Sequence, residues 1–219
     1  MTDYLDVSYS IKKKPLTNYP KKLAKYICDN YYNKKRGSLL DVGCGRGDQL
    51  LAFEKLGFKC VGVDNSQRSK DFLKDKFVKV NVFKEKFPFE DESFDFIFCK
   101  SVIEHVPLEA QAHFFSECYR VIKKEGTAVF MTIDWETNYK IFFTEYTHIY
   151  PFAISSLEQC LKIYNFSNIH IERFVQLPIV WDFPSLKILT WLVRLLKLPK
   201  INKFLKYSRE LMLLGVGKK

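Results

Sequence analysis

The sequence predicts an α/β fold: a Rossmann-like sheet of seven strands, mostly parallel, with helices on both faces and the last strand antiparallel. Three observations predict it. Apolar runs alternate with helical patterns along the chain, which is typical of such sheets. Three glycines at alternate positions join the first apolar run to a helix in LLDVGCGRGDQL, residues 39–50. The next apolar run, CVGVD at 60–64, ends in a carboxylate where a nucleotide-binding βαβ unit keeps its ribose acceptor.

Each element has its own signal. The strands are short apolar runs, expected at 38–42, 59–63, 77–82, 94–99, 127–133, 168–174 and 210–215. The helices carry apolar residues at helical spacing and are expected at 20–35, 48–56, 69–76, 108–122 and 155–164. Pro20 opens the first helix, Gly57 ends the second, and Ser155 or Ser156 caps the last.

The length of 219 residues favours a single domain over 1–219. Within it we expect an N-terminal cap region with one helix at 1–36, and a helical insertion at 184–207 between the sixth and seventh strands. The start of the chain lacks a secretory signal pattern, and no run of about 18 uncharged apolar residues appears. The six cysteines form no C-x-x-C pair. We therefore expect a cytoplasmic protein with reduced thiols.

The formal net charge of +10 belongs to the two ends of the chain. Residues 1–36 hold nine Lys or Arg against three Asp, and residues 183–219 hold nine against one Glu. Lys12 to Lys14 begin an expected basic arm. Such ends suit nucleic acid, an anionic membrane surface or a phosphate-bearing substrate, and a merely solvated surface is the alternative.

Five predicted strands end in residues that should meet at one crevice, because ligands of such sheets bind beyond the carboxyl ends of the strands. These residues are Gly43, Asp64, Asn81, Cys99 and Asp134.

The motifs resemble one enzyme family. The glycines follow the spacing G-x-G-x-G, one residue shorter than the dinucleotide fingerprint. With Asp41 ahead of them, LDVGCGRG closely resembles motif I of the class I S-adenosylmethionine-dependent methyltransferases, and GVDNS at 62–66 resembles their motif II. The Phe-Asp-x-Ile pattern followed by Glu104-His105-Val106 resembles motif IV of ubiquinone-biosynthesis-type and related small-molecule methyltransferases, the methyltransferase type 11 group.

This resemblance implies S-adenosyl-L-methionine as the cofactor. The main chain at Gly43, Cys44 and Gly45 would face its amino-acid end, and Asp64 would accept its ribose hydroxyls. Asn81 and Val82 would lie at the adenine and Cys99 near the sulfonium. At Asn81 the family usually has Asp, so an acceptor stays and a charge is lost. Asp41, Gly47 and Asn65 complete the candidate set.

Methyl transfer mainly requires alignment of donor and acceptor, and we expect no metal. A hydroxyl acceptor benefits from a general base, for which histidine is suited near neutral pH. The candidates are His148, in the loop that should face the acceptor, and His105, after the fourth strand. The alternatives are a loop-fixing hydrogen bond for His148 and a helix-capping or core hydrogen bond for His105.

The expected function is methyl transfer to a small-molecule acceptor, with a hydroxyl of a sugar or glycolipid favoured. Thr147-His148-x-x-Pro151-Phe152 resembles bacterial methyltransferases of surface-polysaccharide and glycolipid synthesis. One alternative is RNA methylation, suggested by the basic ends but disfavoured because Cys99-Lys100-Ser101-Val102 replaces an N-P-P-Y type tetrad. The other is a non-catalytic, membrane-associated binding protein.

The second alternative comes from SLKILTWLVRLLKL, residues 185–198. This segment predicts a helix that is apolar over most of its circumference, with Lys187, Thr190, Arg194 and Lys197 on one stripe. It could lie in the interface of a membrane's inner face, cover the substrate site, or form a dimer contact. The oligomeric state cannot be read from the sequence.

Overall fold

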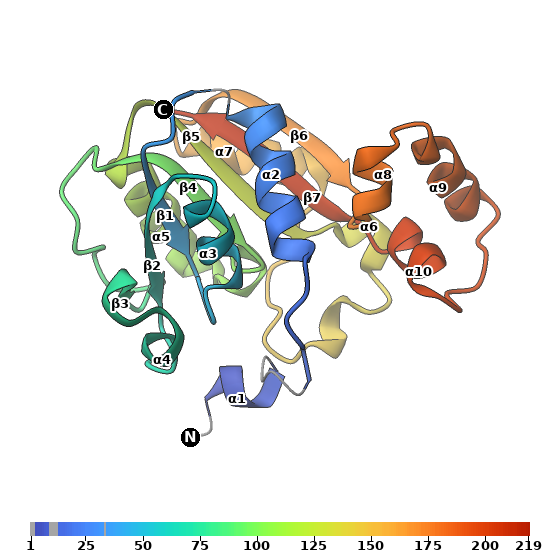
Figure 1. The fold of residues 1–219 in the computed structure, drawn as a ribbon, viewed down its shortest axis with the longest axis horizontal. Coiled ribbons are helices and arrows are strands. Elements are labelled where there is room, and N and C mark those ends of the chain that lie inside the picture. The colour runs from blue at the N-terminus through green and yellow to red at the C-terminus, as the bar shows by residue number, and fades with distance from the viewer. Residues whose placement is uncertain (1–2, 9–12, 33) are drawn as a thin grey trace.

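The computed structural model describes residues 3–8, 13–32 and 34–219. A sheet with the strand order β3-β2-β1-β4-β5-β7-β6 organises them (Figure 1). Its strands are β1 Ser38–Val42, β2 Lys59–Asp64, β3 Phe77–Lys79, β4 Phe94–Lys100, β5 Ile122–Ile133, β6 Ser167–Phe174 and β7 Met212–Lys218. Every neighbouring pair is parallel except those that include β7, which is antiparallel to both β5 and β6. The predicted fold class, including the antiparallel last strand, is confirmed.

The helices of the described residues are α1 Tyr4–Ser8, α2 Tyr19–Tyr31, α3 Asp48–Glu54, α4 Ser69–Leu73, α5 Leu108–Val121, α6 Trp135–Asn138, α7 Ile154–Ile163, α8 Pro178–Asp182, α9 Leu186–Leu195 and α10 Lys203–Arg209. Three short 3-10 turns are η1 Lys74–Lys76, η2 Ile103–His105 and η3 Phe142–Thr144. None of the described helices combines the length and apolar character needed to cross a membrane.

Alternation along the strands creates a separate core on each face of the sheet. On one face, Leu40, Ile97 and Phe130 pack with side chains of α5 and α7. On the other, Leu39 and Phe96 pack with side chains of α2 and α3, which lie in front of the sheet in Figure 1. The two layers fix the strands, so the loops at their carboxyl ends have a rigid base.

Three strands differ from the prediction by more than one residue at an end. β3 ends at Lys79 because the chain turns after it, with the Asn81 side-chain oxygen accepting the Phe83 amide at 3.2 Å. β5 begins at Ile122, earlier than expected. β7 begins at Met212 and continues past Gly215 and Gly217. A Cβ at Gly217 would lie 2.9 Å from Cβ of Phe166, so this glycine permits close packing rather than a turn.

Two regions contain helices that the sequence did not predict. Residues 175–211 connect β6 to β7, and α8 and α10 flank the expected helix α9 there (Figure 1). At the N-terminus, α1 precedes the predicted basic arm. Lys12 of that arm lies outside the described residues, while Lys13 and Lys14 are exposed.

Candidate active site

The turn after β1 is bound to the end of β2 by main-chain and side-chain hydrogen bonds. The amides of Gly43 and Cys44 both donate to the Val63 carbonyl, at 2.8 and 3.1 Å. The Gly45 amide donates to Asp64 Oδ2 at 2.9 Å, and the Ser66 amide donates to Oδ1 at 2.8 Å. The carboxylate of Asp64 therefore faces the glycine turn.

The three glycines of this turn are needed for different reasons. Gly43, Gly45 and Gly47 all adopt positive φ, at 75°, 51° and 76°, a region that L side chains rarely occupy. A Cβ at Gly43 would lie 2.2 Å from the Val102 side chain, and one at Gly47 would lie 2.2 Å from Leu73. At Gly45 the nearest atoms, on Leu5 and Tyr4, are 3.6 and 3.7 Å away. Core packing thus requires two of the glycines, and Gly45 is the one that faces α1.

Helix α1 lies over the turn, and its Tyr4 hydroxyl donates to Asp64, at 2.9 Å from Oδ2 and 3.1 Å from Oδ1. The Ser66 hydroxyl donates to Asp3 at 2.6 Å, and Arg68 pairs with Asp6 at 3.3 Å. Sequence reasoning missed Tyr4 because no motif marks it.

The contact with Tyr4 also tests whether the site fits an adenosyl cofactor. A buried carboxylate that accepts one hydroxyl in this position can accept a ribose hydroxyl in the same way. Burial raises the pKa of Asp64, and the amides of Ser66 and Gly45 counteract the shift. The residues present therefore fit the group, provided that the Tyr4 hydroxyl leaves Asp64.

Asp41 is buried behind the turn, where it pairs with Gly62 in β2 and Phe98 in β4. Burial and the nearby charge of Asp64 raise the pKa of Asp41 to about 8, against the effect of a hydrogen bond from the Leu50 amide. Its Oδ2 has no hydrogen-bond partner among the described residues. This carboxyl is placed to support the turn from within the sheet.

The other predicted cofactor residues differ in what they present to the site. The side chains of Cys44, Val82 and Cys99 are buried in the two cores, and the Cys44 amide already donates to the Val63 carbonyl. Asn81 uses its side-chain oxygen to accept the Phe83 amide, and Asn65 is exposed. Their roles remain predictions.

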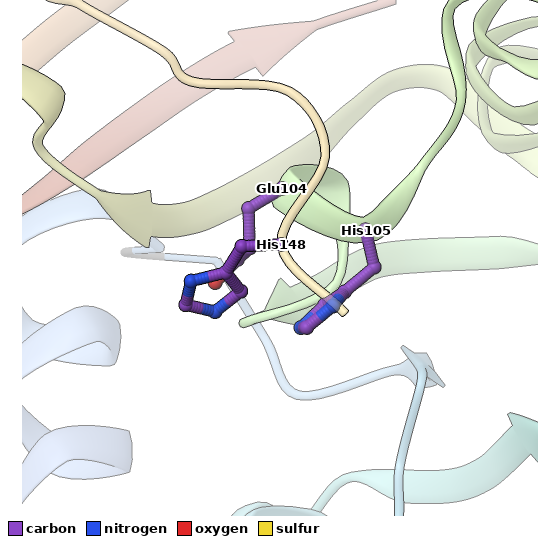
Figure 2. A group of neighbouring side chains, drawn as sticks. All are labelled: Glu104, His105 and His148. Carbon is purple, nitrogen blue, oxygen red and sulfur yellow. The ribbon is translucent and has the colours of Figure 1, made fainter. Parts of the chain in front are cut away.

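The predicted catalytic histidines lie together with Glu104 beyond the end of β4. Figure 2 shows Glu104 and His105 on the turn η2, and His148 on the loop beside it. The amides of Ile149 and Tyr150 donate to the Glu104 carbonyl, at 2.8 and 3.0 Å, and so attach this loop to η2. The two histidine rings have centroids 4.9 Å apart.

Hydrogen bonds to carbonyls define how the two rings are protonated. His105 Nδ1 lies 2.9 Å from the Thr147 carbonyl, and His148 Nδ1 lies 2.7 Å from the Phe142 carbonyl. A carbonyl only accepts, so Nδ1 carries the proton, and in a neutral imidazole Nε2 then has the free lone pair. Burial lowers the pKa of His105, which favours its neutral form.

Sequence reasoning missed Glu104 as a site residue, although it lies within the quoted motif. Its side chain is fully buried, with Oε2 accepting the Thr132 hydroxyl at 2.9 Å and Oε1 lacking a partner in the described part of the chain. Burial raises the pKa of this carboxyl. Lys100, the last residue of β4, interacts electrostatically with Glu104 and Asp41, and burial lowers the pKa of this amine.

This group has two chemical possibilities. One potential donor atom from each of Glu104, His105 and His148 lies within 4.8 Å of the others, so the three residues could together hold a divalent cation. Without a cation, the same Nε2 lone pairs suit a general base. Both possibilities need the loop that carries His148.

Residues 40–130 match the methyltransferase domain family. The uncharacterized methyltransferase YcgJ of Bacillus subtilis is 33% identical over 104 residues, which are 44% of this chain and 40% of that protein. The ubiquinone biosynthesis O-methyltransferase of Rickettsia felis is 30% identical over 114 residues, 49% of this chain and 46% of that protein. A protein of the same name from Saccharophagus degradans is 29% identical over 171 residues, 74% of this chain and 67% of that protein. The matches to the first two relatives thus span less than half of each.

Solved structures show the same fold. A SAM-dependent methyltransferase from Archaeoglobus fulgidus is similar over 100% of both chains, with a TM-score of 0.70 and 21% identity. Phosphoethanolamine N-methyltransferase 2 of Haemonchus contortus, in complex with S-adenosyl-L-methionine, is similar over 99% of this chain and 59% of that one, with a TM-score of 0.66 and 17% identity. These structures show the fold alone, and the match to the methyltransferase domain family is confined to residues 40–130.

Proposed function

We propose that the chain is an S-adenosyl-L-methionine-dependent methyltransferase that methylates a hydroxyl of a small-molecule acceptor. The observation that carries this proposal is the geometry at the end of β2, where Asp64 faces the glycine turn and already binds a hydroxyl. The family match over 40–130 supports the reaction type.

The bound cofactor would supply an activated methyl group, and the protein's own groups would bind and orient it. Asp64 would accept the ribose hydroxyls, and the turn at Gly43, Cys44 and Gly45, whose amides are bonded to β2, would face the amino-acid end. Buried Asp41 supports this turn, and Lys100 interacts electrostatically with both Asp41 and Glu104.

His148 is the proposed base. As the acceptor oxygen bonded to the methyl carbon and the donor's carbon–sulfur bond broke, Nε2 of His148 would take the hydroxyl proton. The hydrogen bond from Nδ1 to the Phe142 carbonyl keeps the ring in the tautomer that this transfer needs. His105 is the second candidate for the same role.

We propose that the acceptor is a sugar or a glycolipid. Exposed aromatic side chains near His148 support it, because flat faces of rings bind sugars and lipid chains alike: Tyr146 is 97% exposed, Phe143 62% and Tyr139 54%. A phenolic hydroxyl is the second candidate, favoured by the relatives named ubiquinone biosynthesis O-methyltransferases.

The test is methyl transfer from labelled S-adenosyl-L-methionine to two acceptor panels, sugar nucleotides with glycolipids, and dihydroxylated phenols. The proposal expects label in one panel, and loss of that label in His148→Ala. Running each assay with a chelator and with added divalent cations separates the base from a cation site. Label in neither panel would contradict the proposed acceptor class. Activity that His148→Ala leaves unchanged would contradict the proposed base.

A further inference from the structure

Helix α9 has the inverse of the orientation expected in a water-soluble protein. Its polar residue Thr190 is fully buried against the rest of the chain, next to Val193. On the opposite side, Ile188 is 67% exposed, Trp191 53% and Leu195 58%. Amphipathic surface helices normally turn their apolar side toward the core.

The apolar side is held outward by specific contacts. Arg194 donates to the Ser208 carbonyl of α10 at 2.9 Å, which attaches the side of α9 that carries Thr190 and Arg194 to α10. Helix α8, which precedes α9, is attached to α2 and β6 through Trp181, whose ring packs on Tyr26 and Phe174 at 5.2 and 5.1 Å. We define the insertion patch as Ile188, Trp191, Leu192, Leu195 and Leu196, all of them exposed.

Basic residues predominate in the segment that carries the insertion patch. Residues 183–209 include seven Lys or Arg and no Asp or Glu. Five of these cations are exposed, and two of the five, Lys200 and Lys206, pair with Glu210. The other three, Lys187, Lys197 and Lys203, form no ion pair with another residue that the structure describes.

We propose that the insertion patch binds the surface of an anionic lipid bilayer. Large apolar side chains within a basic surround are the arrangement by which a helix lies in a membrane interface, with its cations at the headgroups. A second copy of the chain is disfavoured as the binding partner, because pairing two patches would bring the seven basic residues of each copy close to those of the other. A lid on the acceptor site is disfavoured as well, because the exposed side chains Ile188, Trp191 and Leu195 of α9 point away from the rest of the protein.

The segment that carries the insertion patch leaves the sheet at the carboxyl ends of the strands, the same end at which the candidate active site lies. β6 runs parallel to β5, since both are antiparallel to β7, and residues 175–211 leave from its carboxyl end. Membrane binding would therefore bring the mouth of the site near a lipid-linked acceptor, a consequence that rests on the proposed function. The binding itself does not depend on catalysis.

Sedimentation with lipid vesicles tests the proposal. We expect the full chain to sediment with vesicles of phosphatidylcholine and phosphatidylglycerol at low salt, and much less with phosphatidylcholine alone or at high salt. The triple variant Lys187→Gln, Lys197→Gln, Lys203→Gln should bind roughly 100-fold more weakly, at about fivefold for each basic residue. Ile188→Asp with Leu195→Asp should abolish binding.

The chain offers matched controls. Lys70, Lys84 and Lys86 are exposed lysines outside the insertion, so their triple change to Gln removes the same charge. Ile163→Asp, at a side chain of α7 that is 70% exposed, is the control for the changes to Asp. Both controls should bind like the unaltered chain.

The fluorescence of Trp191 reports vesicle binding by the unaltered chain. Its emission should shift to the blue with anionic vesicles, and Trp191→Phe should remove that shift. Equal binding to neutral and anionic vesicles, no binding at low salt, or a concentration-dependent dimer that buries Trp191 without lipid would overturn the proposal. Because vesicle binding needs no methyl donor, its failure is distinguishable from a failure of the proposed function.

Discussion

On one side of the candidate site the main chain supplies many of the polar groups, whereas on the other side they come from side chains. At the glycine turn, the amides of Gly43, Cys44 and Gly45 are all held by β2. Around His148, the groups come from η2, the end of β4 and a loop. The first arrangement requires particular residue types at fixed spacing, and the second leaves most of the loop free to vary. The glycine turn is therefore constrained by residue type and spacing, whereas the His148 loop is constrained by the few contacts that attach it to η2.

The largest expected effect is at His148, on the side of the site where side chains supply the polar groups. His148→Ala should lower kcat by about 10² to 10⁴, the usual contribution of a general base, with little change in cofactor affinity. Steady-state kinetics and a cofactor titration measure the two quantities. His113→Ala, in α5, is the control. An equal loss of cofactor affinity in His148→Ala would show that the two sides are not separate.

For the glycine turn, we predict that a substitution at Gly43 lowers the stability of the protein. Gly43→Ala puts a Cβ into the Val102 side chain and strains a positive φ. Together these should lower the free energy of unfolding by about 3 kcal/mol, measured by urea denaturation. Gly45→Ala, which meets nothing closer than 3.6 Å, should cost less. Equal losses at the two positions would contradict the assignment of Gly43 to core packing.

Asp41 should make stability depend on pH. Its pKa is raised to about 8 in the folded protein, so the folded state keeps a proton that the unfolded state has released. Stability is therefore fully present below the unfolded pKa and falls as pH rises toward 8, with a slope of at most about 1.4 kcal/mol per pH unit. Asp41→Asn should flatten this dependence in urea titrations between pH 5 and about 8. An unchanged slope would show that other groups cause it.

The smallest effect concerns Tyr4. If its hydroxyl competes with a ribose hydroxyl for Asp64, Tyr4→Phe should tighten cofactor binding by about three- to tenfold, the value of one ordinary hydrogen bond. Calorimetry measures the change, with the exposed Tyr139→Phe as the control. Weaker binding in Tyr4→Phe would mean that this hydroxyl holds the cofactor instead.

The sequence predicts some parts of the molecule well because they depend on local rules. The order of strands and helices follows from alternating apolar runs, and the β1 turn follows from glycines that must adopt positive φ. The end of β7 was predicted too early, at Gly215, whereas the strand continues to Lys218 and its two glycines admit Leu157 and Phe166 to the sheet. That closeness is a property of packing between distant segments.

The site shows the same limit. His105 and His148 were both singled out, but only the fold shows that their rings are neighbours and that Glu104 joins them, because 42 residues separate His105 from Thr147, its carbonyl partner. Tyr4 reaches Asp64 across 60 residues and has no motif of its own. The outward orientation of α9 depends on Arg194 bonding to Ser208, which no helical pattern can indicate.

Calorimetric titration of S-adenosyl-L-methionine into the unaltered chain and into Asp64→Ala tests the central claim most directly. Asp71→Ala, an exposed change in α4, serves as the control. The account predicts saturable binding to the unaltered chain and to Asp71→Ala, and no measurable heat with Asp64→Ala that remains folded. No binding to the unaltered chain at millimolar donor, or undiminished binding to Asp64→Ala, would contradict it.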